Sequence, residues 1–305
     1  MKILVTGGLG FIGSALHNHL KKKHNVYILD KIKIKKKNYL NCNLLNKKEL
    51  DKIKIKNIDL VIHLASQSSV AKSYSNIEKD LKSNILATYN LLNWCGKNKV
   101  KKIFFSSTYN VYTEKYNKIF YNEKNECNPH SYYGISKLTS EMYIKTFCNE
   151  NKIKWNILRL FNVYGSNQKY TDYHGLVNIF LYMAKRKGEI IVKGKLNRTR
   201  DFIHIDDVIN AIDLLIKSKK THNKIFNIGT GKSTSLKELV QIISSVLKKK
   251  ILIKEKKGTK GDFKVCCADI SDISKKTKFK INWSLFDGIN NVNNILDKKN
   301  ENFCF

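Results

Sequence analysis

The sequence predicts an α/β fold, a doubly wound parallel sheet followed by a smaller mixed α/β domain. In the first half, short apolar strands alternate with helical patterns, which is typical of parallel βαβ units. The first strand, residues 2–6, runs directly into Gly7-Gly8-Leu9-Gly10-Phe11-Ile12-Gly13 and then a helix, the glycine spacing of a dinucleotide-binding (Rossmann) turn. With 305 residues, the chain is long enough for two domains.

Apolar periodicity places the remaining elements. We expect further strands at 25–29, 60–64, 102–106 and 156–160, and helices at 13–23, 76–97 and 133–149. Glycines and polar residues from 165 to 175 mark a change, after which helices at 176–187, 206–217 and 236–247 mix with short strands. The predicted domains are 1–165 and 166–305, with the segment of about 201–228 packing back onto the first.

The net charge of +32 does not indicate a nucleic-acid site. Of the 57 Lys and Arg residues only four are Arg, and the lysines are spread along the chain. Nucleic-acid surfaces favour clustered charge and arginine, so we infer a compositional bias and expect no specific nucleic-acid partner.

No apolar run is long enough for a membrane span and no signal peptide is visible, so we expect no membrane partner and a cytoplasmic protein. The seven cysteines form no C-x-x-C pair, so we expect reduced thiols and no metal site.

The glycine turn predicts the cofactor. Glycines allow a tight turn and close approach to a pyrophosphate, while the helix N-terminus supplies N–H groups and a positive dipole. Asp30 lies at the end of the second strand, where a carboxylate can bind the ribose hydroxyls of adenosine. This favours NAD, and Lys31 and Lys33 keep NADP as the alternative because they can accommodate a 2′-phosphate.

A tyrosine and a lysine predict the chemistry. Tyr133 and Lys137 share one face of a helix. A free tyrosine has a pKa near 10, and a nearby ammonium lowers it toward the range of a useful base. Tyr132 is the rival phenol, although its spacing to Lys137 fits a helix face less well.

Polar residues elsewhere suggest contacts to a second ligand. Ser106, Ser107 and Thr108 end a strand, where ligands gather in doubly wound sheets, and one hydroxyl there can bind a reacting oxygen. Three residues in loop-like contexts suit a phosphate-bearing ligand: Asn162, Arg200 and Asp262. We expect His63 and His204 to be structural.

Taken in order, these segments resemble the extended short-chain dehydrogenase/reductases, specifically the NAD-dependent nucleotide-sugar epimerases and dehydratases, and within them the UDP-glucose 4-epimerases. The similarity covers nearly the whole chain: the cofactor turn at 6–13, His63-Leu64-Ala65-Ser66-Gln67, the Ser/Thr segment at 106–112, Y-x-x-x-K at 133–137, Leu158 to Gly165, Arg200 to Val208, Phe226-Asn227-Ile228-Gly229 and Gly261-Asp262.

The resemblance implies a set of site residues. The catalytic residues would be Thr108, Tyr133 and Lys137. The cofactor residues would be Gly7, Gly10, Phe11, Ile12, Gly13, Asp30, Asn43, Leu44, Leu64, Ala65, Ser66, Asn84, Tyr133 and Lys137. The substrate residues would be Ser69, Thr108, Tyr133, Asn162, Arg200 and Asp262, with specificity in loops between Gly165 and Arg200 and after Gly229.

The resemblance also implies a reaction and an assembly. Residues 1–165 would bind NAD and residues 166–305 a nucleotide-diphosphate sugar. The sugar would be oxidised at C4 to a transient 4-keto form and reduced on its other face, which inverts C4. Helices 76–97 and 133–149 would form the four-helix interface of a homodimer.

The sequence departs from the family pattern at several positions. Asn43 replaces an adenine-facing aspartate, Ala87 replaces a frequent glycine, and the arginine usual before Gly261-Asp262 is missing, with Lys260 nearby. Tyr109 and Asn110 stand where dehydratases carry Asp and Glu, which disfavours dehydration.

Two alternatives stay open. One is a reductase or synthase that acts on a 4-keto deoxysugar nucleotide. The other is a non-catalytic Rossmann module that binds dinucleotide, or RNA through its basic surface.

Overall fold

The structure is a computed structural model that describes residues 1–115, 119–168 and 175–301, with side chains to residue 298. Of the sequence predictions, Cys304 and the part of the specificity loop at 169–174 lie outside the described residues. Contacts along the chain divide it into two units. Unit 1 comprises Met1–Thr113, Asn125–Arg159 and Ile212–Phe226, and unit 2 comprises Glu114–Lys124, Leu160–Ala211 and Asn227–Phe305.

A seven-stranded sheet forms the framework, in the order β12-β7-β5-β4-β1-β2-β3. β1 pairs in parallel with β2 and β4, β2 with β3, and β4 with β5. The strands are β1 (Lys2–Thr6), β2 (Asn25–Asp30), β3 (Tyr39–Asn41), β4 (Leu60–His63), β5 (Lys102–Thr108), β7 (Lys154–Leu160) and β12 (Lys224–Ile228). The order 3-2-1-4-5 reverses between β1 and β4, and ligands of doubly wound sheets bind at that crevice. The predicted fold class is confirmed.

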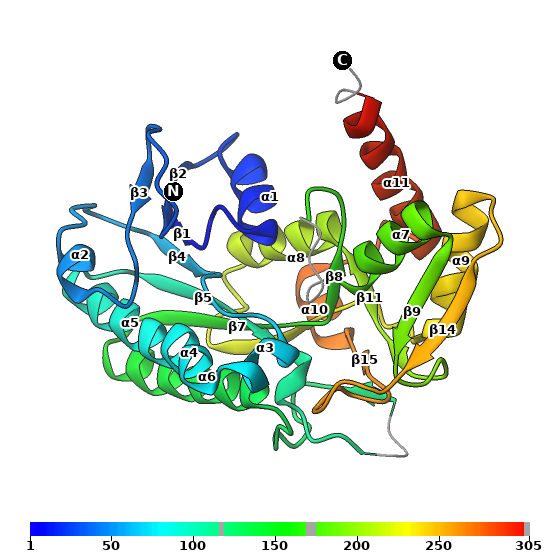
Figure 1. Cartoon of the computed structure of the whole chain (residues 1–305). Coiled ribbons are helices and arrows are strands. Elements are labelled where there is room, and N and C mark those ends of the chain that lie inside the picture. The colour runs from blue at the N-terminus through cyan, green and yellow to red at the C-terminus, as the bar shows by residue number, and fades with distance from the viewer. Residues whose placement is uncertain (116–118, 169–174, 302–305) are drawn as a thin grey trace. The chain divides into compact units, whose positions relative to one another are not determined.

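Helices cover the two faces of the sheet in unit 1. Figure 1 shows α1 on one side and α4, α5 and α6 on the other. These helices, with the shorter ones near them, are α1 (Phe11–Leu20), α2 (Lys47–Asp51), α3 (Val70–Ser75), α4 (Ile77–Leu81), α5 (Ala87–Lys97) and α6 (Tyr132–Glu150). Buried side chains such as Leu4, Val61, Ile103 and Ile144 form the core between the sheet and the helices α5 and α6.

The helix predicted over 76–97 is confirmed, and it contains a π-helical turn that the sequence did not predict. A π-helical turn, η1 (Lys82–Leu86), separates α4 from α5, and the N–H of Ala87 donates to the carbonyl of Lys82. The carbonyl of Asn84 accepts instead from the hydroxyls of Thr88 (2.5 Å) and Ser140 (3.1 Å). Such π turns concentrate at functional sites.

The first helix is displaced from the predicted 13–23, because it begins directly after Gly10 and ends before the lysines at 21–23.

Unit 2 has its own core. It holds β6 (Phe120–Tyr121), β8 (Asn162–Tyr164), α7 (Leu176–Lys187), β9 (Glu189–Lys193), β10 (Thr199–Arg200), β11 (Phe202–His204), β13 (Thr234–Ser235), α9 (Leu236–Leu247), β14 (Leu252–Lys256), β15 (Cys267–Ala268), α10 (Ser271–Thr277) and α11 (Leu285–Glu301). α8 (Ile205–Lys217) runs from this unit into unit 1. Apolar side chains of α7, α9, α11 and β9 pack together, and the predicted helices 176–187 and 236–247 are confirmed.

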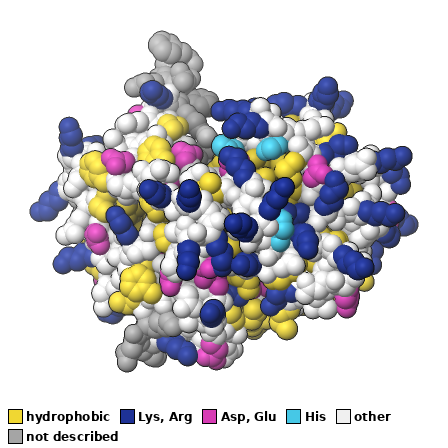
Figure 2. All heavy atoms as spheres, turned by 180° about the vertical axis from the view of Figure 1, so that it is seen from behind, with side chains coloured by type: hydrophobic (Ala, Val, Ile, Leu, Met, Phe, Trp, Pro, Cys, Tyr) yellow, Lys and Arg dark blue, Asp and Glu magenta, His cyan; other side chains and the backbone are white. Residues whose placement is uncertain are grey.

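On the face shown in Figure 2 the surface charge is spread rather than gathered. Figure 2 shows lysine and arginine side chains scattered over the visible face, among apolar and acidic ones. Within the described ranges, every helix is too short or too polar to cross a bilayer, and no group of three or more His, Cys, Asp or Glu is placed to hold a metal ion.

Candidate active site

The glycine turn lies at the carboxyl end of β1, and close packing explains its glycines. Gly7 has φ of +67°, and a Cβ there would lie 2.7 Å from the N of Ala65. A Cβ on Gly13 would lie 2.3 Å from the carbonyl oxygen of Gly7. The turn therefore packs directly on the Leu64-Ala65-Ser66 segment after β4, which brings these predicted cofactor residues together.

Asp30 lies beside the same turn. Its Oδ2 accepts from the N–H of Leu9 (3.1 Å) and its Oδ1 from the N–H of Ile32 (3.2 Å). The side-chain amide of Asn41 donates to the carbonyl of Asp30 (3.3 Å). Asn43 lies two residues further along the chain, and the Oδ1 of Asn43 accepts from the N–H of Leu45 (3.1 Å). The oxygen that replaces the family's aspartate is thus partly used within its own turn. Leu44 is buried, and its carbonyl accepts from Asn90 (2.8 Å).

An amide network connects the loop after β4 to α6. Asn84 accepts from the N–H of Gln67 (2.8 Å) and donates to the hydroxyl of Ser136 (2.9 Å). The side chain of Gln67 in turn forms two hydrogen bonds with the backbone of Ser69. Its Nε2 donates to the Ser69 carbonyl, and its Oε1 accepts from the Ser69 N–H. Ser69 is the N-cap of α3, so its hydroxyl accepts from the N–H of Lys72 (3.3 Å).

Tyr133 is the phenol inside the protein. Its side chain is 7% exposed and hydrogen-bonded to Thr108, whereas Tyr132 is 40% exposed and stacks edge-on against Tyr74. Thr108 Oγ1 also accepts from the backbone N–H (3.2 Å) and side-chain amide (2.9 Å) of Asn110. The buried Oδ1 of Asn110 has no hydrogen-bond partner in the described part of the chain. An acceptor is therefore available beside the Tyr133–Thr108 pair.

Burial controls the ionisation of the site. It raises the pKa of Tyr133 well above its usual range, and the hydrogen bond with Thr108 offsets part of this effect. It lowers the pKa of Lys137 to about 7, although Asp80 and Glu141 favour the charged form. Lys137 Nζ donates to the carbonyl of Ser106 (2.7 Å). In the free protein the phenol is therefore neutral at pH 7, because burial dominates its pKa.

His63 is structural, as expected. It lies in β4 between the hydroxyls of Thr6 (2.7 Å) and Thr88 (3.0 Å). Burial, reinforced by Lys137, lowers the pKa of His63 to about 3, so the ring is neutral.

Unit 2 gathers the other predicted substrate residues. Arg200 Nη2 contacts Asp262 Oδ1 (2.6 Å), and Asn162 donates to the carbonyl of Asp201 (3.2 Å). The expectation that Asn162 and Arg200 lie in loops is wrong. Asn162 pairs with Phe202 between β8 and β11, and Arg200 with Thr234 between β10 and β13, because these short pairings satisfy their backbone groups.

Sequence reasoning missed a second arginine at this position. Arg198 Nη1 contacts Asp262 Oδ2 at 2.5 Å, so one carboxylate lies between two guanidinium groups. The alternation Arg198-Thr199-Arg200, which puts both side chains on the same side of a strand, was the signal available in the sequence.

Comparison with known proteins identifies the family. Residues 3–229 match the profile of the NAD-dependent epimerase/dehydratase family. The chain belongs to this family. It is 37% identical over 249 residues to a putative UDP-glucose 4-epimerase of Methanocaldococcus jannaschii, covering 79% of this chain and 81% of the relative. It is 31% identical to a dTDP-4-dehydro-6-deoxyglucose reductase of Escherichia coli, with 82% and 83% covered.

A solved structure supports the same assignment. The UDP-glucose 4-epimerase of Thermotoga maritima, determined with UDP-glucose, superposes with a TM-score of 0.92 at 31% identity, covering 98% of this chain and 99% of that one. The prediction of an extended short-chain dehydrogenase/reductase is confirmed, and NAD is the cofactor of its family.

The residues of unit 1 fit NAD. The Gly7–Gly13 turn leaves no room for side chains, and α1 begins at Phe11 with no side-chain cap on its first N–H groups. Phe11, Ile12 and Gly13 therefore present backbone N–H groups of the kind that bind a pyrophosphate. Asp30 lies at the same turn, where it would meet the ribose hydroxyls.

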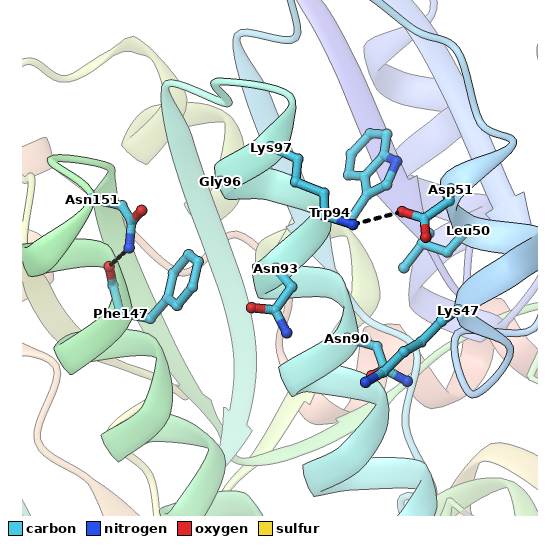
Figure 3. Close-up of a pocket in the computed structure, with 10 residues that line it drawn as sticks. All are labelled: Lys47, Leu50, Asp51, Asn90, Asn93, Trp94, Gly96, Lys97, Phe147 and Asn151. Atoms are coloured by element: carbon cyan, nitrogen blue, oxygen red, sulfur yellow. Dashed lines mark hydrogen bonds and ion pairs between the residues drawn. The ribbon is translucent and has the colours of Figure 1, made fainter.

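A groove of about 350 Å³ lies elsewhere in unit 1, between α2, α5 and α6. Figure 3 shows the Asp51–Lys97 ion pair (3.1 Å) on one side of α5, and Phe147 with Asn151 on the other. None of the predicted site residues lines it. The groove is therefore not part of the candidate active site.

Proposed function

We propose that the protein catalyses NAD-dependent epimerisation of a nucleotide-diphosphate sugar at C4, through a transient 4-keto sugar. The observation that carries this proposal is the buried Tyr133 phenol. It is hydrogen-bonded to Thr108 at the end of β5, in the same unit as a glycine turn that fits the cofactor. Its i,i+4 partner Lys137 is fixed to the Ser106 carbonyl of that strand.

The roles of the side chains follow from this arrangement. NAD, when bound, would supply the group that takes up the hydride of C4 and returns it. The phenolate form of Tyr133, which the charged Lys137 and the positive nicotinamide ring would make accessible, takes the proton of the C4 hydroxyl as the 4-keto sugar forms and gives it back to the oxygen on reduction. Thr108 orients the C4 oxygen, and Asn110 Oδ1 accepts from a sugar hydroxyl. Lys137, when charged, stabilises the phenolate.

The nucleotide end of the substrate is assigned to unit 2. Two guanidinium groups, Arg198 and Arg200, flank Asp262. Arginine binds phosphate in a bidentate manner, so this cluster suits the diphosphate. Asn162, whose amide donates to the carbonyl of Asp201 (3.2 Å), is the further polar residue that we assign to the substrate.

The test is a turnover assay on paired C4-epimeric sugar nucleotides with different bases, analysed by NMR. Wild-type protein should interconvert the two epimers with no net change in reduced nicotinamide. Tyr133→Phe should lower kcat by about 10²–10⁴-fold, with substrate and NAD binding retained. Tyr132→Phe is the matched control and should remain active. Full activity of Tyr133→Phe would contradict the proposal.

A second candidate is reduction of a 4-keto deoxysugar nucleotide, which the similarity to the Escherichia coli reductase favours. A reductase would consume reduced nicotinamide in stoichiometric amounts on a 4-keto substrate. The same assay therefore separates the two candidates.

We also propose a homodimer through α4, α5 and α6. Among the residues whose side chains the structure describes, sixteen large hydrophobic side chains are exposed. Eight of them lie on α4, α5, α6 and η1: Ile77, Leu81, Leu86, Tyr89, Tyr132, Ile135, Met142 and Tyr143. The rings of Tyr89 and Tyr143 lie 6.4 Å apart, so they belong to one continuous apolar face. An exposed patch of this kind is typical of an interface.

A further inference from the structure

Asp80 is a buried carboxylate whose partners carry no charge. It lies in α4 and is 1% exposed. Its Oδ1 accepts from the side-chain amides of Gln67 (2.6 Å) and Asn84 (3.2 Å). Among the described residues, no basic side chain forms an ion pair with it.

A buried carboxylate of this kind lowers the stability of the folded protein, so its charge is expected to have a function. Burying a carboxylate costs several kcal/mol when only neutral groups receive it, and its usual response is to pair with a cation. Two amide donors would be served equally well by the oxygen of an asparagine. The charge of Asp80 therefore needs an explanation that its hydrogen bonds do not provide.

The hydrogen bonds of Asp80 lead to the catalytic helix. Asn84 Nδ2 also donates to Ser136 Oγ (2.9 Å), and that hydroxyl donates to the carbonyl of Tyr133 (3.0 Å). The path thus runs from α4 through η1 to the first turn of α6, which carries Tyr133 and Lys137.

Lys137 directly follows Ser136 in α6, so the path of hydrogen bonds from Asp80 ends beside this buried cation. Glu141, on α6, is already paired with Arg159 of β7 at 2.7 Å. His63, on β4, is neutral because burial lowers its pKa to about 3. Asp80 is the largest influence that favours the charged form of Lys137, ahead of Glu141, and it also acts on Tyr133.

We propose that Asp80 is a positioning residue and the internal counter-ion of Lys137: its charge keeps the lysine ammonium stable inside the protein, while its amide contacts fix Asn84 and Ser136 beneath the Tyr133–Lys137 pair. The part that concerns turnover rests on the proposed function, whereas the electrostatic part does not.

The sign of the effect is the same for both catalytic groups. A negative charge stabilises an ammonium and destabilises a phenolate, so it raises both pKa values. Removing the charge of Asp80 should lower the pKa of Lys137 and that of Tyr133. Both limbs of a bell-shaped pH–rate profile should then move to lower pH.

The first experiment needs no substrate. Protein labelled with [ε-¹³C]lysine is titrated by NMR, and the Lys137 signal is assigned by its loss in Lys137→Met. Lys102, whose pKa burial lowers to about 8, is assigned in the same way with Lys102→Met. In Asp80→Asn the Lys137 midpoint should fall by about one pH unit or more. Lys102 is the internal control and should not move.

An unchanged Lys137 midpoint in Asp80→Asn would overturn the proposal. Asp80→Glu keeps the charge and should hold the midpoint near that of the wild type. If the Asp80→Asn variant does not fold, Asp80→Ser is used in its place, since serine leaves space for water beside Gln67 and Asn84. The Lys137 midpoint should fall by the same amount in this variant.

The second experiment measures turnover against pH on the holoenzyme. Asp80→Asn should shift both limbs of the kcat profile to lower pH while KM changes little. If kcat falls while both limbs of the pH–rate profile stay in place, Asp80 has only a structural role, and the proposal that it is the counter-ion of Lys137 is refuted. Asp59→Asn, which removes a carboxylate paired with Lys101 (2.7 Å), is the matched control and should leave the profile in place. Absence of turnover on every sugar nucleotide would refute the proposed function and leave the NMR result to decide.

Discussion

The buried ion pair between Arg159 and Glu141 gives a quantitative test of how unit 1 is stabilised. Arg159 donates from Nε to Oε1 (3.0 Å) and from Nη2 to Oε2 (2.7 Å) of Glu141. The two side chains are 3% and 0% exposed. Ser107 Oγ donates to the same carboxylate at 2.5 Å, so the pair also holds the residue before Thr108.

Arg159→Met would leave Glu141 buried with the Ser107 hydroxyl as its remaining partner among these groups. Stranding one member of a buried ion pair costs about 3–5 kcal/mol. The guanidinium also stacks over Tyr112, with Cζ 4.8 Å from the ring centroid, which adds about 0.5–2 kcal/mol of lost contact. We therefore expect Arg159→Met to lower the free energy of unfolding by at least about 3 kcal/mol.

The assay is urea denaturation followed by circular dichroism, on Arg159→Met, Glu141→Leu and the double variant. Because the double variant removes both charges, it should be more stable than either single variant, and it can approach the wild type. Additive losses, or a loss below about 1 kcal/mol in Arg159→Met, would refute the reasoning.

Three further predictions follow from single contacts. Gly13→Ala places a Cβ 2.3 Å from the Gly7 carbonyl and should weaken NAD binding at least about tenfold in calorimetry, whereas Gly258→Ala, whose Cβ meets nothing closer than 3.6 Å, should bind normally. Met142→Glu places a charge on the apolar face of α6 and should shift sedimentation from dimer to monomer; a wild-type monomer at micromolar concentration would contradict the proposed interface. Because the pKa of Lys137 is about 7 when folded and near 10.4 when unfolded, the unfolded state binds more protons between these values, and this lysine's penalty fades as pH rises. The stability gained by Lys137→Met over the wild type should therefore be about 3.5 kcal/mol larger at pH 7 than at pH 10 in denaturation curves, and an equal gain at both pH values would contradict this.

The features that sequence predicted well are those fixed by neighbours along the chain. The glycine spacing from Gly7 to Gly13 and the position of Asp30 at a strand end sufficed to predict the first βαβ unit and the cofactor. The contact between Asp30 and the N–H of Leu9 arises because both lie at the carboxyl edge of adjacent parallel strands. Local patterns determine such edges.

The features that sequence did not predict depend on partners far along the chain. The π turn η1 is accompanied by a hydrogen bond to the carbonyl of Asn84 from the hydroxyl of Ser140, which lies 56 residues away. The importance of Asp80 is visible only once Gln67, from the loop after β4, is seen to donate to it. Arg198 gains meaning through Asp262, 64 residues further on. Periodicity within α4 or β10 carries no information on these pairings.

The ionisation of the site is the clearest case in which three-dimensional burial overrides a local motif. The i,i+4 spacing suggested that Lys137 lowers the pKa of Tyr133 through proximity. The structure instead has both groups buried, so each is driven toward its neutral form: the pKa of the phenol rises, and that of the ammonium falls to about 7. A Tyr–Lys spacing alone therefore does not make a base. The motif becomes useful because Thr108 donates or accepts at the phenol, and because the negative charge of Asp80 favours the ammonium.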